Sequence, residues 1–162
     1  MRPTFYYEQD NIKYELRAGG VLFYKKTDDG TYFLMIRSRG KLEDFGGCTD
    51  QADRDIFDTI SREVEEESNK IFDRNDIRKR LDNFVPIISK ESKYMLFLLP
   101  LVGKDEKIEP SDFGNKEDHD NIERTVEWVN ADNFSDSTFF NRELNFRLKI
   151  NSLRNLYDGT NI

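Results

Sequence analysis

Three glutamates in the middle of the chain have the residue type and the spacing to bind a divalent metal ion. They stand in the run Arg62-Glu63-Val64-Glu65-Glu66-Glu67. Hydrophobic residues recur around this run at the spacing of an amphipathic helix, which we expect over residues 53–68: Ile56, Phe57, Ile60 and Val64. At about 100° per residue, Glu63, Glu66 and Glu67 share one face of that helix. A hard cation such as Mg²⁺, which takes oxygen ligands, would relieve the repulsion between these carboxylates.

A glutamate-rich helix face is often only solvated surface, and 35% of the residues in this chain are charged. The residues before the helix favour a binding site instead. Glu43-Asp44-Phe45 reads as the end of a strand, and Gly46-Gly47 follows directly. Paired glycines let the backbone turn sharply and bring a carbonyl close to a ligand. A glycine turn before a carboxylate-lined helix is a reasonable way to build a site for a metal and a phosphate.

The stretch from Gly46 to Asn69 resembles the Nudix box, the signature of the Nudix hydrolase superfamily. That pattern reads Gly, five residues, Glu, seven residues, then Arg-Glu-aliphatic-any-Glu-Glu-any-Gly-aliphatic. Here Gly47 and Asp53 match the first part, with Asp in place of Glu, and eight residues rather than seven precede Arg62. The residues from Arg62 to Glu67 match in strict order, whereas Asn69 and Lys70 replace the glycine and the aliphatic residue.

The resemblance implies a set of site residues. Glu66 and Glu67 would bind Mg²⁺ or Mn²⁺, and Glu63 would bind metal or act as a base. Arg62 would orient a carboxylate, and the carbonyl of Gly46 would complete the metal shell. The catalytic residues implied are Arg62, Glu63 and Glu67. The reaction implied is cleavage of a pyrophosphate bond by metal-activated water, in a nucleoside diphosphate linked to another group.

Many Nudix members add one more acidic ligand from the loop before a late strand. Four acids compete for that role here: Glu117, Asp118, Asp120 and Glu123. Glu123 is favoured because it lies nearest the start of the strand, although each acid alone could be a solvated loop residue. Glu127, within that strand, is a candidate for a structural ion pair.

Basic residues that could bind the substrate stand before the glycine pair. They are Arg37, Arg39 and Lys41, of which Arg37 is the best candidate. A guanidinium fork suits phosphate oxygens. The alternative, which is equally weighted, is that these residues balance the nearby acids Glu43 and Asp44.

The order of predicted elements indicates one α/β domain covering residues 1–162. Strands are expected at 12–17, 21–24, 31–37, 84–89, 94–102 and 123–129, with a hairpin turn at Asp28-Asp29-Gly30. The segment 71–83 should form a short helix or an irregular crossing capped near Asn75-Asp76, residues 103–120 a long loop, and residues 141–156 a closing helix. Residues 1–10, with Phe5, Tyr6 and Tyr7, should form an arm that covers the core. The resemblance implies an α/β/α sandwich with a mixed β-sheet between helices.

Composition excludes several classes of protein. The net charge of −7 and the pI of about 4.9 disfavour a general nucleic-acid-binding surface. The single cysteine, Cys48, and the single histidine, His119, exclude an internal disulfide and make a Cys/His zinc site very improbable. The chain has no secretory leader pattern and no run of 18 apolar residues, so a soluble cytoplasmic protein without membrane contact is expected.

Other functions stay open at this level. The substrate could be a small nucleotide, a capped RNA or a diphosphoinositol phosphate, and the acidic pI weakly disfavours the last two. The chain could also be a catalytically silent nucleotide-binding or regulatory domain of the same fold, although such proteins typically lose glutamates that are present here. An acidic interaction module with a chance motif would show no metal-dependent activity. A monomer and a homodimer are both compatible with the sequence.

Overall fold

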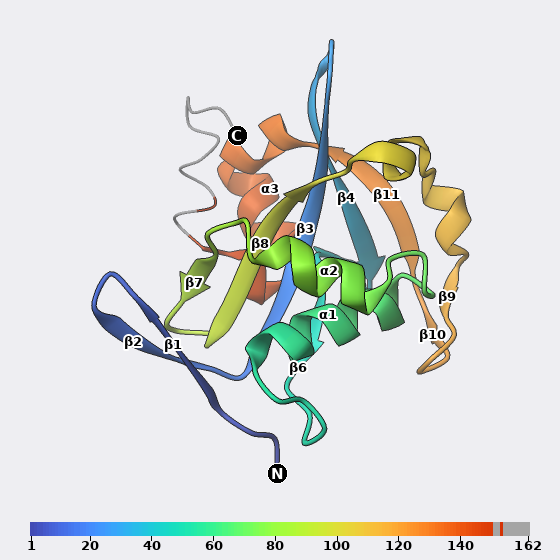
Figure 1. Ribbon diagram of the computed structural model, residues 1–162. Helices are drawn as coiled ribbons and strands as arrows, with labels where there is room; N and C mark the ends of the chain where they lie inside the picture. The colour runs from blue at the N-terminus through green and yellow to red at the C-terminus, as the bar shows by residue number, and fades with distance from the viewer. Residues whose placement is uncertain (151–152, 154–162) are drawn as a thin grey trace. The chain divides into compact units, whose positions relative to one another are not determined.

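The computed structural model describes residues 1–150 and 153 (Figure 1). It confirms the predicted α/β class, with a mixed β-sheet and few helices. The chain forms two compact units. Unit 1 combines Met1–Val21 with Phe45–Leu98, and unit 2 combines Leu22–Asp44 with the chain from Leu99 onward. A single domain over 1–162 therefore stays a prediction.

Unit 1 begins with a hairpin that the sequence analysis treated as an arm. Strand β1 (Phe5–Gln9) pairs antiparallel with β2 (Ile12–Leu16). The two residues between them, Asp10 and Asn11, have φ angles of 53° and 64°. Asp and Asn tolerate this left-handed conformation, which a two-residue turn between twisted strands requires. The strand predicted at 12–17 is thus confirmed over Ile12–Leu16, and residues 1–10, predicted as an arm, contain a further strand.

The paired glycines lie in a strand rather than in a turn. Strand β6 (Phe45–Cys48) pairs with the first residues of β3 (Ala18–Thr27), so that Gly46 lies opposite Gly20 and Gly47 opposite Gly19. The prediction of a sharp turn at this pair is therefore wrong. Glycine is required here because neighbouring atoms fill the space that a side chain would need.

Helix α1 (Ile56–Glu67) confirms the predicted amphipathic helix, with a later start. Asp55 caps it, because its side chain accepts a hydrogen bond of 2.9 Å from the backbone N–H of Asp58. The helix buries Ile56, Ile60 and Val64, as the hydrophobic spacing predicted. It ends before Asn69 and Lys70, whose φ angles of 51° and 66° lie in the left-handed region.

The remainder of unit 1 packs around this helix. Helix α2 (Arg74–Leu81) is capped by Asp73, two residues before the predicted cap. Strand β7 (Ile87–Ser89) pairs with β8 (Tyr94–Pro100), whose residues Met95, Leu96, Phe97 and Leu99 are buried as expected for the core. The ring of Phe57 packs 6.0 Å from that of Tyr7 and 6.2 Å from that of Phe97, measured between centroids.

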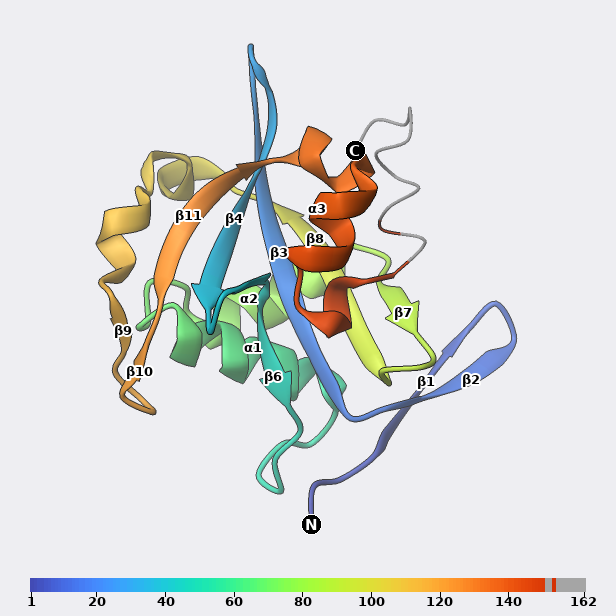
Figure 2. The ribbon, with the colours of Figure 1, turned by 180° about the vertical axis from the view of Figure 1, so that it is seen from behind.

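Unit 2 contains the predicted hairpin. The second part of β3 pairs with β4 (Gly30–Ser38) across the turn at Asp28-Asp29. Strand β4 also pairs with β5 (Lys41–Glu43) and with β11 (Thr125–Asn130), and Figure 2 shows β11 beside β4. The core of this unit includes Phe33 and Phe134, whose ring centroids are 4.9 Å apart.

The segment expected to be a long loop has local structure. It holds the 3₁₀ helices η1 (Gly103–Lys107) and η2 (Pro110–Phe113), and then β9 (Lys116–Glu117) paired with β10 (Ile122–Glu123). The strand predicted at 123–129 is divided at Arg124, whose buried side chain donates hydrogen bonds to the carbonyls of Phe113 and Gly114.

The prediction of one continuous closing helix over 141–156 is wrong. After η3 (Ala131–Ser135), helix α3 (Ser137–Arg142) ends at Arg142, and η4 (Phe146–Leu148) follows. Between them Leu144 forms a β-bridge with Leu42, because Leu42 donates its N–H to the carbonyl of Glu143 and its carbonyl accepts the N–H of Asn145. Residues 151–152 and 154–156 of the predicted helix lie outside the described residues.

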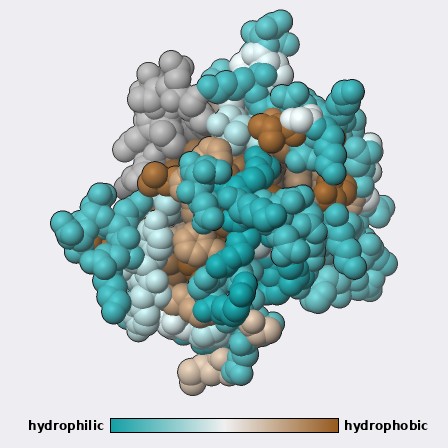
Figure 3. Space-filling view, viewed as in Figure 1, coloured by the Kyte–Doolittle hydropathy of each residue, from teal (hydrophilic) through white to brown (hydrophobic). Residues whose placement is uncertain are grey.

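The surface is strongly polar. The face seen in Figure 3 is mostly hydrophilic, with small hydrophobic areas between charged residues. Among the described residues, no helix has both the length and the apolar character needed to cross a membrane.

Candidate active site

The glutamates of the central run point in different directions. Glu65 binds Arg74 of α2, with 2.7 Å between Oε1 and the side-chain Nε, and 2.9 Å between Oε2 and the backbone nitrogen. Glu63 and Glu66 instead contact the guanidinium of Arg62. Helical spacing predicts this division. Glu65 therefore links α1 to α2, and the other two glutamates lie on another side of α1.

Arg62 holds Glu63 and Glu66 together. Its Nη1 lies 3.0 Å from Oε1 of Glu63 and 3.3 Å from Oε2 of Glu66. Its Nη2 donates to the backbone carbonyl of Cys48 at 2.9 Å. Since both carboxylates meet the same nitrogen, they lie close together, and the guanidinium neutralises part of their repulsion.

Asp53 holds Arg62 from the other side. The two side chains form a bidentate pair, with Nε 2.9 Å from Oδ1 and Nη2 3.0 Å from Oδ2. Oδ2 of Asp53 also accepts hydrogen bonds from the hydroxyl of Thr59, at 2.7 Å, and from the backbone N–H of Asp50, at 2.9 Å. Only 3% of the Asp53 side chain is exposed. No role was predicted for Asp53 from the sequence, because one residue more than the Nudix pattern allows separates it from Arg62. The spacing from Gly47 was the signal that could have identified it, because the insertion lies after Asp53.

Burial and hydrogen bonding have opposite effects on the pKa values of Asp53 and Arg62. Burial alone would raise the pKa of Asp53, but the hydrogen bonds from Arg62, Thr59 and Asp50 outweigh it and lower that pKa. Burial likewise opposes the charged form of Arg62, yet its hydrogen bonds with Asp53 and the negative charges of Glu63 and Asp53 raise its pKa. Both groups are therefore charged at neutral pH.

Strand β6 lies directly against two of the glutamates. Glu67 is buried and its Oε1 accepts a short hydrogen bond from the backbone N–H of Gly46. A Cβ atom placed on Gly47 would lie 2.4 to 2.6 Å from the carboxylate atoms of Glu63. These contacts explain why glycine occupies both positions: any side chain would enter the space of the carboxylates or of the neighbouring strand.

The residue types at this side of α1 fit a hard divalent cation. Carboxylate oxygens and backbone carbonyls are the ligands that Mg²⁺ and Mn²⁺ take. Within the described part of the chain, however, no three acidic, histidine or cysteine side chains converge in a metal-binding arrangement. Arg62 supplies the positive charge between Glu63 and Glu66, and the predicted role of the Gly46 carbonyl stays a prediction.

Comparisons with known proteins give a limited likeness. No family model matches the sequence, and no curated protein matches it significantly. The structure is similar to that of a Caenorhabditis elegans Ap4A hydrolase in a binary complex. The identity is 16%, the TM-score is 0.48, and the match covers 86% of this chain and 93% of that one. A second structure of C. elegans Ap4A hydrolase matches at 15% identity with a TM-score of 0.40, over 72% of this chain and 80% of that one. These values carry no inference about activity.

The site residues predicted in unit 2 occupy a different environment. Arg37 forms a bidentate pair with Glu127, with both N···O distances 3.1 Å, and lies 3.8 Å from Glu143. The hydrogen bonds that Arg37 donates to Glu127 raise the pKa of Arg37 against the opposing effect of burial. Glu127 is thus an ion-pair partner, as suspected. Arg37 and Glu123 line one pocket of ≈ 520 Å³ together with Thr125.

The other predicted site residues of unit 2 differ in how far their side chains are exposed to solvent. Arg39 is exposed in a turn, with a φ of 52°. Of the four competing acids, Glu117 is buried, whereas Asp118, Asp120 and Glu123 are exposed. Their roles, like those of Arg37 and Arg39, stay predictions.

Proposed function

We propose that this protein is a divalent-metal-dependent hydrolase that cleaves a pyrophosphate bond in a nucleoside diphosphate linked to another group. One observation carries the proposal. Glu63, Glu66 and Glu67 meet Arg62 and the backbone of β6, whereas the intervening Glu65 is used to bind α2. The match of this arrangement to the Nudix-box sequence supports the reaction type.

In the proposed reaction, the oxygen of water forms a bond to one phosphorus and the P–O–P bridge breaks, which leaves two phosphorylated products. Glu63, Glu66, Glu67 and the carbonyl of Gly46 would hold Mg²⁺ or Mn²⁺. When bound, the ion neutralises phosphate charge and lowers the pKa of water. Glu63 is the proposed base, because the Nudix-box resemblance gives this position the role of a metal ligand or a base.

Arg62 is proposed as a positioning residue. Asp53 and the Cys48 carbonyl fix its guanidinium, so that Nη1 can orient Glu63 and Glu66. Binding of an ion to these glutamates replaces part of the charge that Arg62 supplies. The roles proposed for Arg37 and Arg39 on substrate phosphate and for Glu123 on metal await mutagenesis. We take the enzyme to be cytoplasmic and to act as a monomer or a homodimer.

The test is a screen of nucleotide substrates with Mg²⁺ and Mn²⁺, comparing wild type with two isosteric variants. Glu66→Gln should lower kcat/KM by about 100-fold or more, because it removes the charge of a metal ligand. Glu65→Gln is the matched control and should keep activity near that of wild type, because the Glu65 carboxylate binds Arg74 of α2. Equal activity in both variants would contradict the proposal, provided that thermal unfolding shows both to be folded.

A nucleotide-binding domain without hydrolysis is the second candidate. It is favoured by the position of the Arg62 guanidinium between Glu63 and Glu66, where it already balances their charge. This candidate predicts no product in the screen but a saturable, Mg²⁺-independent shift in melting temperature with one of the same nucleotides.

A further inference from the structure

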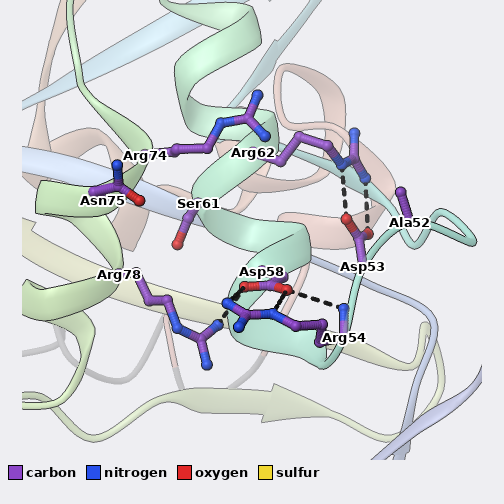
Figure 4. A pocket seen from close by; sticks show the side chains of 9 residues that line it. All are labelled: Ala52, Asp53, Arg54, Asp58, Ser61, Arg62, Arg74, Asn75 and Arg78. Atoms are coloured by element: carbon purple, nitrogen blue, oxygen red, sulfur yellow. Dashed lines mark hydrogen bonds and ion pairs between the residues drawn. The ribbon is translucent and has the colours of Figure 1, made fainter.

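A second charged site lies between α1 and α2, within unit 1. It is a pocket of ≈ 210 Å³ formed by the loop before α1, one side of α1 and the start of α2 (Figure 4). Four arginines line it: Arg54, Arg62, Arg74 and Arg78. The lining also has two carboxylates, those of Asp53 and Asp58. Asp55 and Glu65 pair with Arg78 and Arg74 from outside the lining.

Carboxylates hold these guanidinium groups in place. Arg54 forms a bidentate pair with Asp58, at 2.8 and 3.1 Å. Arg78 contacts Asp58 at 2.7 Å and binds Asp55, which lies outside the lining, at 2.7 and 2.8 Å. Figure 4 shows Arg54 and Arg78 meeting at Asp58. The side chains are therefore ordered before any ligand arrives, which reduces the conformational entropy that binding would cost.

Several donors of the pocket are not used by these pairs. Arg74 binds Glu65 through Nε, and among the described residues its Nη1 and Nη2 make no hydrogen bond. Nη1 of Arg54 and the side-chain amide of Asn75, which also lines the pocket, likewise have no hydrogen-bond acceptor in the described part of the chain. Guanidinium groups with free N–H pairs suit the oxygens of a tetrahedral oxyanion.

We propose that this pocket binds a phosphate dianion, either inorganic phosphate or the terminal phosphate of a nucleotide, with Arg74 and Arg54 as its principal donors and Asn75 as a further donor. The dianion accepts the N–H groups that the carboxylates leave unused. The pocket shares Arg62 with the proposed hydrolase site but does not include Glu63, Glu66 or Glu67. Phosphate binding through Arg74 and Arg54 therefore does not require the proposed hydrolase activity.

The test is a titration of the whole protein with inorganic phosphate at low salt, in which calorimetry measures the binding. Arg74→Ala and Arg54→Ala should each weaken binding about tenfold, because each removes a charge-assisted donor. Arg54 is a suitable second variant because 77% of its side chain is exposed, so its loss leaves the fold intact. Lys79→Ala is the matched control: it removes the same charge from the exposed side of α2 without touching the pocket.

Each outcome has a defined meaning. No phosphate binding by wild type, or equal weakening by Lys79→Ala, would overturn the proposal, since the effect would then be absent or only that of net charge. Loss of phosphate binding in Glu66→Gln would also overturn it, because it would place the anion at the other side of α1. A parallel titration with AMP distinguishes the two sources: tighter binding than inorganic phosphate identifies a nucleotide, and equal binding identifies free phosphate.

Discussion

The two sides of helix α1 differ because of what packs against each. On one side, the backbone of β6 approaches the carboxylates of Glu63 and Glu67, and Arg62 contacts Glu63 and Glu66. On the other side, α2 offers arginines, which form ion pairs with Asp58 and Glu65 of α1. A neighbouring backbone brings carboxylates close together, whereas a neighbour with long basic side chains pairs with each of them.

Arg62 and Asp53 connect these two sides. Both line the arginine-rich pocket, yet Nη1 of Arg62 reaches the glutamates of the acidic side. The buried Asp53 carboxylate fixes the guanidinium at the boundary. The comparison can therefore be tested by changing the glycines of the acidic side, the connection itself, and the ion pair on the α2 side.

The largest effect is expected from the glycines, which should differ from each other. In Gly46→Ala, the new Cβ would lie 2.2 Å from the Tyr94 hydroxyl and 2.5 Å from the carbonyl oxygen of Gly19. Because a backbone atom of the paired strand cannot move aside, we expect the free energy of unfolding to fall by about 3 kcal/mol in a urea titration.

Gly47→Ala is the matched comparison. Its Cβ would meet only the end of the flexible Glu63 side chain, so the loss of stability should be about 1 kcal/mol or less. The displaced carboxylate should nevertheless lower any metal-dependent activity. Equal destabilisation by both variants would show that the acidic side is not shaped by the close approach of β6.

An intermediate effect is expected from Asp53→Asn. This change leaves the Arg62 guanidinium, of which 14% is exposed, without its bidentate carboxylate, and should lower the free energy of unfolding by about 2 kcal/mol at neutral pH. The pKa of Asp53 is lowered in the folded state from its ordinary value of 3.8. Its contribution to stability is therefore complete above that value and disappears as pH falls through the lower, folded-state pKa.

Acid titrations of the unfolding free energy check this prediction. The wild-type curve should fall more steeply below pH 3.8 than the curve of Asp53→Asn. Asp50→Asn is the control, because Asp50 is exposed and its hydrogen bonds with Asp53 use its backbone N–H and carbonyl, which the substitution keeps. If the free energy of unfolding fell equally steeply below pH 3.8 in all three proteins, the Asp53–Arg62 pair would not contribute to folding stability.

The smallest effect is expected from Glu65→Gln, on the α2 side. The ion pair is partly solvated, with 45% of the Arg74 side chain exposed, so its loss should cost about 0.5 kcal/mol in a urea titration. Metal-dependent activity should not change. A loss of activity in Glu65→Gln comparable to that in Glu66→Gln would remove the distinction between the two sides of the helix.

Much of the local structure could be predicted from the sequence. The hydrophobic spacing identified α1, the Asp-Asp-Gly turn identified the hairpin of β3 and β4, and the apolar run identified β8. The failures have specific causes. The hairpin of β1 and β2 turns on Asp10 and Asn11, which carry no glycine signal. The closing helix was overestimated because the β-bridge between Leu42 and Leu144 interrupts it after Arg142.

The sequence alone determined which glutamates share a face of α1, because helical periodicity is a local property of the chain. Only the tertiary structure decided what each charge contacts. It placed Gly46 and Gly47 in a strand against the glutamates, bound Glu65 to Arg74, and joined Asp53 to Arg62. The pocket of four arginines was likewise invisible in the sequence, because its members come from a loop and two helices and meet only when these segments pack together.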